Sequence, residues 1–439
     1  MQLTEIKLPW FSRQIWAVGG VLFLILATSF VGVRTYRNFA APSREFDWES
    51  RGMSDFYTLY YYSRAFADGV NPYSTEVMER PEYIVPRNAA PFSPFAFLPD
   101  IPLTYLSLEV ASVVFFVFSW LLIGVLAWCC LWMVRVRFDW ALWVWIFGFL
   151  VFSRPGHITL FTGYFTVQLV LGTMVALHYS KSKPWLAGIG FLFASVKPTY
   201  VIPLTLLMLA RRDFKTVAIG VVLTSVFAIG CFGWLASHSD FGSVIEGIRS
   251  GQEAFHDDPT EEPANTWTRI DVAGMVAKMM HRVPGNVEYL TVMMGLLVLP
   301  CLALWRLSAR ELTTQEQDSG AAGLSAMIVL LAMLVTIYHH SYDCIIVAVS
   351  LFAMLLNSRR LVSGMSRPTA ILIAMLLAVP MFNYASTRAV RNKLGFEQQD
   401  VVWQAITLLN GACLTLALLI AMYIVFNKKT AIRGETSSG

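Results

Sequence analysis

The chain has 439 residues, of which 56% are hydrophobic and 14% are charged, and its formal net charge is +4. Soluble domains carry about 25% charged side chains, so this composition excludes an ordinary soluble protein and indicates a chain built for lipid. The basic residues stand singly or in pairs at the ends of apolar runs, which argues against a nucleic-acid partner. The six cysteines lie in or beside apolar segments without zinc-site spacing, so we expect no disulfide framework, no metal and no cofactor.

Apolar runs recur along the whole chain, and crossing a hydrocarbon core of about 30 Å takes roughly 20 apolar residues in a helix. They predict an all-α, polytopic transmembrane helix bundle forming a single domain, residues 1–439, with about 12 spanning or half-spanning helices. The first run, 17–33, is longer than the apolar part of a usual signal peptide and is expected to remain as an anchor. The predicted segments are 15–33, 106–133, 139–153, 158–179, 185–196, 198–210, 216–235, 287–306, 322–338, 342–357, 369–384 and 401–426.

Two of these segments, 185–196 and 198–210, are too short for full crossings, and Lys197 with Pro198 interrupts them. A helical hairpin of half depth explains both features. It leaves the basic residues of the neighbouring turns on one side, and the positive-inside rule then predicts cytoplasmic termini in the plasma (inner) membrane. The two long segments 34–105 and 236–286 are expected to be external loops. In the second loop a solvated acidic surface is predicted from Asp257, Asp258, Glu261 and Glu262.

In the first long loop, aromatic residues recur at helical spacing over 54–69. This stretch predicts an interfacial amphipathic helix that begins with Ser54 or Asp55 as its N-cap and ends at Gly69. Such a helix would hold Asp55 at the membrane surface, although a lone carboxylate at this position can also serve only as a helix cap. The proline-punctuated apolar stretch 90–99 is expected to line a lid or a substrate channel.

Further polar residues map to the same predicted external face. Ionisable groups at membrane depth are costly and usually face a cavity. Taken singly, each has an ordinary explanation, since a lysine can snorkel, an arginine can pair with a headgroup and two histidines can end a helix. Their shared side favours a common site, whose members are Arg154, His157, Gly163, Tyr164, Gln168, Lys197 and the segment 338–343, with His339, His340 and Asp343.

A carboxylate that faces arginine, lysine and histidine at a lipid interface suits sugar transfer from a polyprenyl phosphate. This reaction needs a base for the acceptor hydroxyl and cations for the phosphate leaving group. Arginine offers a planar fork to phosphate oxygens and lysine a point charge, while histidine can donate a hydrogen bond or act as an acid or base. The residue types therefore fit the division of roles that this chemistry requires.

The chain resembles glycosyltransferase family 87, a polyprenyl-phosphate-dependent branch of the multi-spanning C-type glycosyltransferases. The resemblance rests on motifs spread over most of the chain, namely Asp55-Phe56 with Tyr60-Tyr61, Asp68-Gly69-Val70-Asn71-Pro72-Tyr73, the proline-rich stretch 91–99, Gly163 to Leu169, 186–190 through Lys197-Pro198-Thr199, and His339 to Asp343. In one departure, this chain has Tyr164 where the family motif commonly has glutamine after the glycine, and its nearest glutamine is Gln168.

The resemblance implies that Asp55 is the catalytic base and that Lys197 and His339 or His340 contact the donor phosphate. Arg154 is placed near the same phosphate. The substrate pocket is expected to include Tyr60, Tyr61, Gly163, Tyr164, Gln168 and Asp343.

The implied activity moves a hexose or pentose from a polyprenyl-phosphate donor to an extracytoplasmic glycan or glycolipid acceptor, with inversion. Mannose, arabinose, glucose and galactosamine-type donors all satisfy these residues. Two other classes stay open. A secondary transporter would share the spans and midplane charges but should show two related halves, and no duplication is visible. A lipid-glycan polymerase or ligase would use a polyprenyl diphosphate and would rely on arginines.

Overall fold

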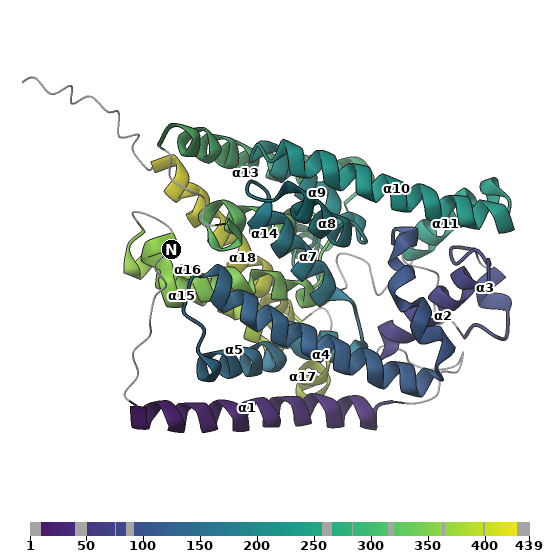
Figure 1. Ribbon diagram of the computed structural model, residues 1–439, viewed down its shortest axis with the longest axis horizontal. Coiled ribbons are helices and arrows are strands. Elements are labelled where there is room, and N and C mark those ends of the chain that lie inside the picture. The colour runs from purple at the N-terminus through teal and green to yellow at the C-terminus, as the bar shows by residue number, and fades with distance from the viewer. Residues whose placement is uncertain are drawn as a thin grey trace, which may run out of the picture.

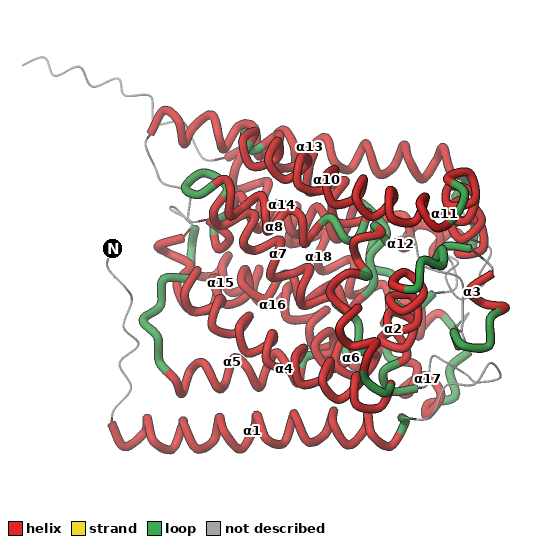
Figure 2. The backbone as a smooth tube through the Cα atoms, turned by 45° about the vertical axis from the view of Figure 1, so that its right-hand side comes forward, coloured by secondary structure: helices red, strands yellow, loops and turns green. Residues whose placement is uncertain are grey.

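The computed structural model describes residues 10–39, 51–74, 76–84, 92–256, 266–282, 284–314, 320–361, 365–397 and 400–427, and all regular elements in these ranges are helices. The axes of the long helices α1, α4, α10 and α13 are roughly aligned, and shorter helices pack between them (Figures 1 and 2). This arrangement confirms the predicted polytopic helix bundle.

Six helices in the described ranges are long and apolar enough to cross a membrane, or seven spans if a bent helix pair counts as one. The six are α1 (Trp10–Arg37), α4 (Leu108–Met133), α10 (Phe214–His238), α13 (Asn286–Thr314), α16 (Arg367–Phe382) and α18 (Val401–Asn427). The bent pair is α5 (Trp140–Phe152) and α6 (Arg154–Thr162), whose axes differ by 67°. Shorter apolar helices are α7 (Thr166–Tyr179), α8 (Pro184–Ala194), α9 (Pro198–Ala210), α14 (Leu324–Thr336) and α15 (Ala348–Leu361), which follows η5 (Ser341–Val347).

The predicted continuous segment 158–179 is wrong, because the chain breaks there into α6 and α7. Gly163 ends α6 with a φ of 73°, a left-handed conformation that glycine adopts without a steric cost. The next helix begins only at Thr166. The break matters for the site, because it leaves the carbonyl of Phe161 near the end of α6 available to the N–H of Met53.

The predicted pair of short helices is confirmed as α8 and α9, whereas its half depth in the membrane stays a prediction. Arg211, which follows α9, donates from Nη2 to the hydroxyl of Ser180, at the end of α7, over 3.1 Å. The start of α8 and the end of α9 therefore lie at the same end of the bundle, with Lys197 at the opposite tip. Helices of 11 and 13 residues reach only about 16–20 Å, which is short of a full crossing.

The remaining helices are short or lie at the ends of spans. They are α2 (Ser54–Ala67), α3 (Glu76–Glu79), η2 (Pro94–Ala96), η3 (Leu98–Tyr105), α11 (Phe241–His256), α12 (Val272–Met280), η4 (Gly320–Ala322), η6 (Tyr384–Ser386) and α17 (Arg388–Leu394). In both views α2, α3 and α11 lie together at one end of the bundle, which we call the α2 end (Figures 1 and 2).

Helix α2 matches the predicted stretch but differs in its cap and its surroundings. The N-cap is Met53, with a φ of 64° and no side-chain capping bond, so neither Ser54 nor Asp55 caps the helix as predicted. The C-terminal end agrees with the prediction, since Gly69 has a φ of 75° directly after the helix. Eleven of the fourteen residues are buried, so α2 is more enclosed than an amphipathic helix resting on a membrane surface.

Parts of the two predicted loops lie outside the described residues. These parts are 40–50, 75, 85–91, 257–265 and 283. They include Pro91 and the predicted acidic surface of Asp257, Asp258, Glu261 and Glu262.

Candidate active site

The N-terminus of α2 is fixed to the broken end of α6. The backbone N–H of Met53 donates to the carbonyl oxygen of Phe161 over 2.6 Å. Gly163 lies so close to α2 that a Cβ atom added to it would be 2.6 Å from Cβ of Phe56. These contacts place Asp55, in the first turn of α2, beside the loop that carries Tyr164.

Asp55 also lies near a segment almost 300 residues later in the chain. The Asp55 side chain is partly exposed, and its carboxylate is close enough to Tyr342 to interact electrostatically with the phenol. Tyr342 belongs to η5, the element that follows the two predicted histidines. The fold thus brings the predicted base within electrostatic range of the predicted phosphate-binding segment.

The centre of that segment is a buried ion pair. Lys197 Nζ lies 3.1 Å from Oδ2 of Asp343, and the two side chains are 6% and 0% exposed. Asp343 also accepts from the hydroxyl of Tyr200 over 2.9 Å and from the backbone N–H of His340 over 3.2 Å. Because three donors surround this carboxylate, Asp343 orients Lys197 rather than acting as a free base.

Aromatic rings enclose the Lys197 ammonium. Its Nζ lies 5.5 Å from the ring centroid of Tyr164, 5.6 Å from that of Tyr200 and 5.3 Å from that of Tyr342. The ring faces are electron-rich, so each of these contacts favours a cation at this distance. The structure therefore brings the predicted residues Lys197, Tyr164 and Asp343 together with Tyr342 of the predicted segment 338–343. It adds Tyr200, which the sequence analysis did not single out.

His340 is bonded through both ring nitrogens. Nδ1 lies 2.6 Å from the hydroxyl oxygen of Thr268, and Nε2 lies against the hydroxyl of Tyr338. The imidazole also stacks on Tyr342, with ring centroids 5.0 Å apart. His340 is therefore a member of the same cluster as Lys197.

His339 is oriented differently and is fully buried. Its Nδ1 lies 3.1 Å from the carbonyl oxygen of Ile337, its ring packs 5.1 Å from that of Tyr200, and its Nε2 has no hydrogen-bond partner. Burial lowers the pKa of the imidazole to about 4, so it is neutral near pH 7. A carbonyl can only accept, so Nδ1 carries the proton and Nε2 is left as an acceptor.

A second buried ion pair was not predicted. Arg269 donates from Nε and Nη2 to both oxygens of Asp271, each over 2.9 Å. This segment pairs with the histidine segment, since the N–H of Ile270 donates to the carbonyl of His339 over 3.1 Å. Burial alone would raise the pKa of Asp271, but Arg269 and the N–H of Gly274 outweigh it and hold that pKa below its usual value. The sequence feature that could have revealed this ion pair is an arginine and an aspartate two residues apart, directly before the apolar sequence of α12.

Other predicted site residues have different surroundings. Arg154 is buried and donates from Nη2 to the carbonyl of Ser386 over 3.1 Å, with Nη1 on the hydroxyl of the same residue. The hydroxyl of Tyr60 donates to the backbone carbonyl of Leu106 over 2.7 Å, and the ring of Tyr61 packs edge-on against Tyr60 at 5.2 Å. In α7, Oε1 of Gln168 is buried without a hydrogen-bond partner.

The arrangement combines a carboxylate with groups that attract anions. The ring of Tyr342 lies 5.3 Å from Lys197 Nζ and 5.0 Å from the ring of His340, and the Asp55 carboxylate is within electrostatic range of the Tyr342 phenol. A carboxylate can take a proton from a hydroxyl, and an ammonium and an imidazole can hold a phosphate. Within the described ranges, no three His, Cys, Asp or Glu side chains are grouped so that they could hold a metal ion.

A comparison with protein families gives one match. The model of glycosyltransferase family 87 matches residues 91–336, which is more than half of the chain. The matched part includes Lys197 and the ion pair of Arg269 and Asp271, whereas Asp55 precedes it and His339 follows it. Searches of curated proteins and of solved structures each found no match.

Proposed function

The chain belongs to glycosyltransferase family 87, and we propose that it moves a monosaccharide from a polyprenyl phosphate to a glycan or glycolipid. It is a multi-pass membrane glycosyltransferase. The proposal adds the donor, the acceptor and the role of Asp55 as general base. The observation that supports it is that the Asp55 carboxylate and the Lys197 ammonium both lie within electrostatic range of Tyr342, although the three residues come from distant parts of the chain.

The proposed reaction is a single displacement. Asp55 accepts the proton of the acceptor hydroxyl, whose oxygen forms a bond to the anomeric carbon of the sugar. The bond from that carbon to the phosphate oxygen breaks, and the polyprenyl phosphate leaves with the electron pair. Attack from the face opposite the phosphate inverts the anomeric configuration. The acceptor must therefore lie on the side of Asp55, and the phosphate on the side of Lys197.

Lys197 and His340 are the proposed phosphate contacts. An ammonium has three N–H donors, and Asp343 occupies mainly one of them at 3.1 Å, so donors remain for a phosphate oxygen. Between the two histidines, His340 suits this role better, because neutral His339 offers only an acceptor nitrogen, and His340 would exchange Thr268 or Tyr338 for a phosphate oxygen. The Nε of Arg154 has no hydrogen-bond partner, and Arg154 stays a proposed phosphate contact through that atom.

The sugar pocket is proposed on the α7 side of Lys197. Tyr164 stacks on Phe165 with ring centroids 4.5 Å apart and lies 5.1 Å from the ring of Tyr342. Sugars commonly bind against such rings through their apolar faces, and the unpartnered Oε1 of Gln168 could accept from a sugar hydroxyl. Gly163, Tyr60 and Tyr61 support α2 and act on this pocket through the position of Asp55.

Charge distribution supports an active site on the external face of the inner membrane. The turns at the end opposite Lys197 carry most of the basic residues between α7 and α10. Cytoplasmic turns are enriched in lysine and arginine, so these turns and both termini are proposed to be cytoplasmic. The basic residues of these turns are Lys181, Lys183, Arg211, Arg212 and Lys215.

The test is transfer by the purified protein from a panel of radiolabelled polyprenyl-phosphate sugars. Replacing the base in Asp55→Asn should lower kcat at least about 100-fold on the active donor, which is the usual contribution of a general base. The matched control is Asp68→Asn at the other end of α2, where Asn can still accept the 2.8 Å hydrogen bond from the hydroxyl of Tyr83. Full activity of Asp55→Asn, or transfer only from a diphosphate-linked oligosaccharide, would contradict the proposal.

A further inference from the structure

A short stretch of the second predicted loop, residues 266–271, lies alongside the segment that carries the two histidines. An antiparallel bridge joins Arg269 to His340. Next to this bridge, the backbone N–H of Ser341 donates to the carbonyl oxygen of Thr268 over 2.7 Å. These main-chain contacts fix the position of Thr268 relative to the imidazole of His340.

Thr268 is one link in a chain of side-chain hydrogen bonds that passes through His340. Its hydroxyl oxygen lies 2.9 Å from that of Thr266 and 2.6 Å from Nδ1 of His340. On the other side of the ring, Nε2 lies against the hydroxyl of Tyr338. His340 is buried, whereas Tyr338 is partly exposed. The chain therefore leads from the stretch 266–271 through the buried ring to a partly exposed hydroxyl.

Hydrogen bonds to Nδ1 decide which ring nitrogen of His340 carries the proton. The His340 side chain caps η5 by accepting from the backbone N–H of Asp343. Nδ1 is the ring nitrogen nearer to the main chain, and a backbone N–H can only donate, so Nδ1 carries no proton. The hydroxyl of Thr268 must then donate to Nδ1, and the proton of the neutral ring is on Nε2.

Thr268 is the donor that is committed to Nδ1. The N–H of Asp343 is shared, because it also donates to the backbone carbonyl of His340 over 3.0 Å. The rotatable hydroxyl of Thr268 approaches Nδ1 to 2.6 Å. Loss of this hydroxyl would leave only the shared N–H to hold the orientation and the tautomer of the ring.

We propose that Thr268 is a positioning residue that keeps the His340 proton on Nε2, from which it is donated to the donor phosphate; this inference rests on the proposed function. A phosphate oxygen then replaces Tyr338 on Nε2, while Thr268 keeps its bond to Nδ1. In the other tautomer Nε2 is an acceptor and cannot bind a phosphate oxygen. Thr268 thus acts on the phosphate through His340.

The first test is sugar transfer from the active polyprenyl-phosphate donor. Thr268→Val keeps the shape of the side chain without its hydroxyl and should lower kcat/KM about tenfold, the factor that corresponds to one hydrogen bond. Thr268→Ser, which retains the hydroxyl, should restore the activity. The matched control is Thr266→Val, which removes a hydroxyl that bonds to Thr268 and should stay near the wild type. In a His340→Phe background, Thr268→Val should cause no further loss.

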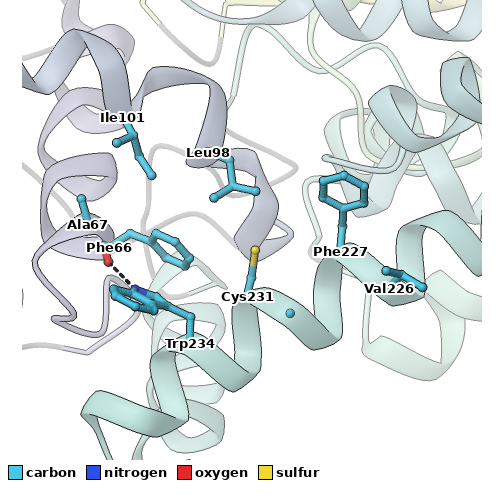
Figure 3. Close-up of a pocket in the computed structure, with 9 residues that line it drawn as sticks. Phe66, Ala67, Leu98, Ile101, Val226, Phe227, Cys231 and Trp234 are labelled. Carbon is cyan, nitrogen blue, oxygen red and sulfur yellow. Dashed lines mark hydrogen bonds between the residues drawn. The ribbon is translucent and has the colours of Figure 1, made fainter.

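The second test is independent of catalysis. ¹⁵N NMR spectra of the histidine-labelled protein distinguish protonated from unprotonated ring nitrogens, and the spectrum of His340→Phe assigns the signals of His340. The wild type should show a protonated Nε2, and Thr268→Val a mixture of the two tautomers. Trp234→Phe removes the 3.0 Å hydrogen bond from α10 to the carbonyl of Phe66 (Figure 3). This variant controls for a general loss of stability and should leave the signals of His340 unchanged.

The inference is overturned if Thr268→Val has the wild-type kcat/KM, or if its loss is equally large in the His340→Phe background. It is also overturned if the wild type and Thr268→Val show the same tautomer of His340. If the wild-type protein transfers sugar from no polyprenyl phosphate, the proposed function fails, and with it the role of Nε2 at the donor phosphate. The NMR spectra then still decide whether Thr268 sets the tautomer, so the two failures are distinguishable.

Discussion

The buried ion pair of Lys197 and Asp343 gives the sharpest test of the site. Asp343→Asn keeps the shape of the side chain but removes its charge. Lys197, only 5% exposed, then loses its counter-ion, and removing one partner of such a pair costs about 3–5 kcal/mol of unfolding free energy. The hydroxyl of Tyr200 and the N–H of His340 must also share an amide that has one acceptor oxygen instead of two.

A double-mutant cycle isolates the pair. Lys197→Met leaves an unpaired carboxylate, whereas Lys197→Met combined with Asp343→Asn leaves no buried charge at this point. The double variant should therefore recover about 2 kcal/mol relative to the sum of the single effects. The free energy of unfolding can be measured by titrating the purified protein in mixed micelles with SDS.

An exposed ion pair serves as the control for this cycle. Arg282 and Glu288 are 2.9 Å apart but 58% and 49% exposed, so Glu288→Gln should leave the unfolding free energy almost unchanged. The reasoning is refuted if Asp343→Asn costs no more than Glu288→Gln. It is also refuted if the effects of Lys197→Met and Asp343→Asn are additive.

Three further predictions concern stability and pH. Gly163→Ala should destabilise the protein by about 1–3 kcal/mol and lower transfer activity, because φ is 73° and the added Cβ would lie 2.6 Å from Cβ of Phe56; an unchanged SDS midpoint would show that α2 and α6 do not meet there. Tyr60→Phe should cost about 1 kcal/mol for the lost bond to Leu106 and leave kcat/KM unchanged, so a large loss of activity would instead place Tyr60 at the substrate. Burial lowers the pKa of the Lys278 ammonium to about 8, below its unfolded value of 10.5. The unfolded chain thus binds more protons between these values, and stability should rise with pH from about 8 to 10.5. Lys278→Met should stabilise the protein at pH 7 and abolish that rise in an SDS titration repeated across pH.

The sequence by itself determined the class of fold and most element positions. Long apolar runs can satisfy their backbone only as helices in lipid, so the spans follow from composition. Two local breaks were also readable, since Pro198 separates α8 from α9 and Gly69 follows the end of α2, but the break at Gly163 between α6 and α7 was missed. The family was also predictable, because its motifs follow one another along the chain. Cap positions were less certain, as Met53 shows, because a tertiary contact to Phe161 fixes the start of α2.

Only the tertiary structure decided which polar residues meet. Lys197 pairs with Asp343 across 146 residues, and Arg154 reaches Ser386 across 232. The physical reason is that a helix surrounded by protein is apolar on every side, so its sequence does not say which face packs where. Helix α14, with all thirteen residues buried, is one example. The approach of Asp55 and Lys197 to Tyr342 depends on those packing choices.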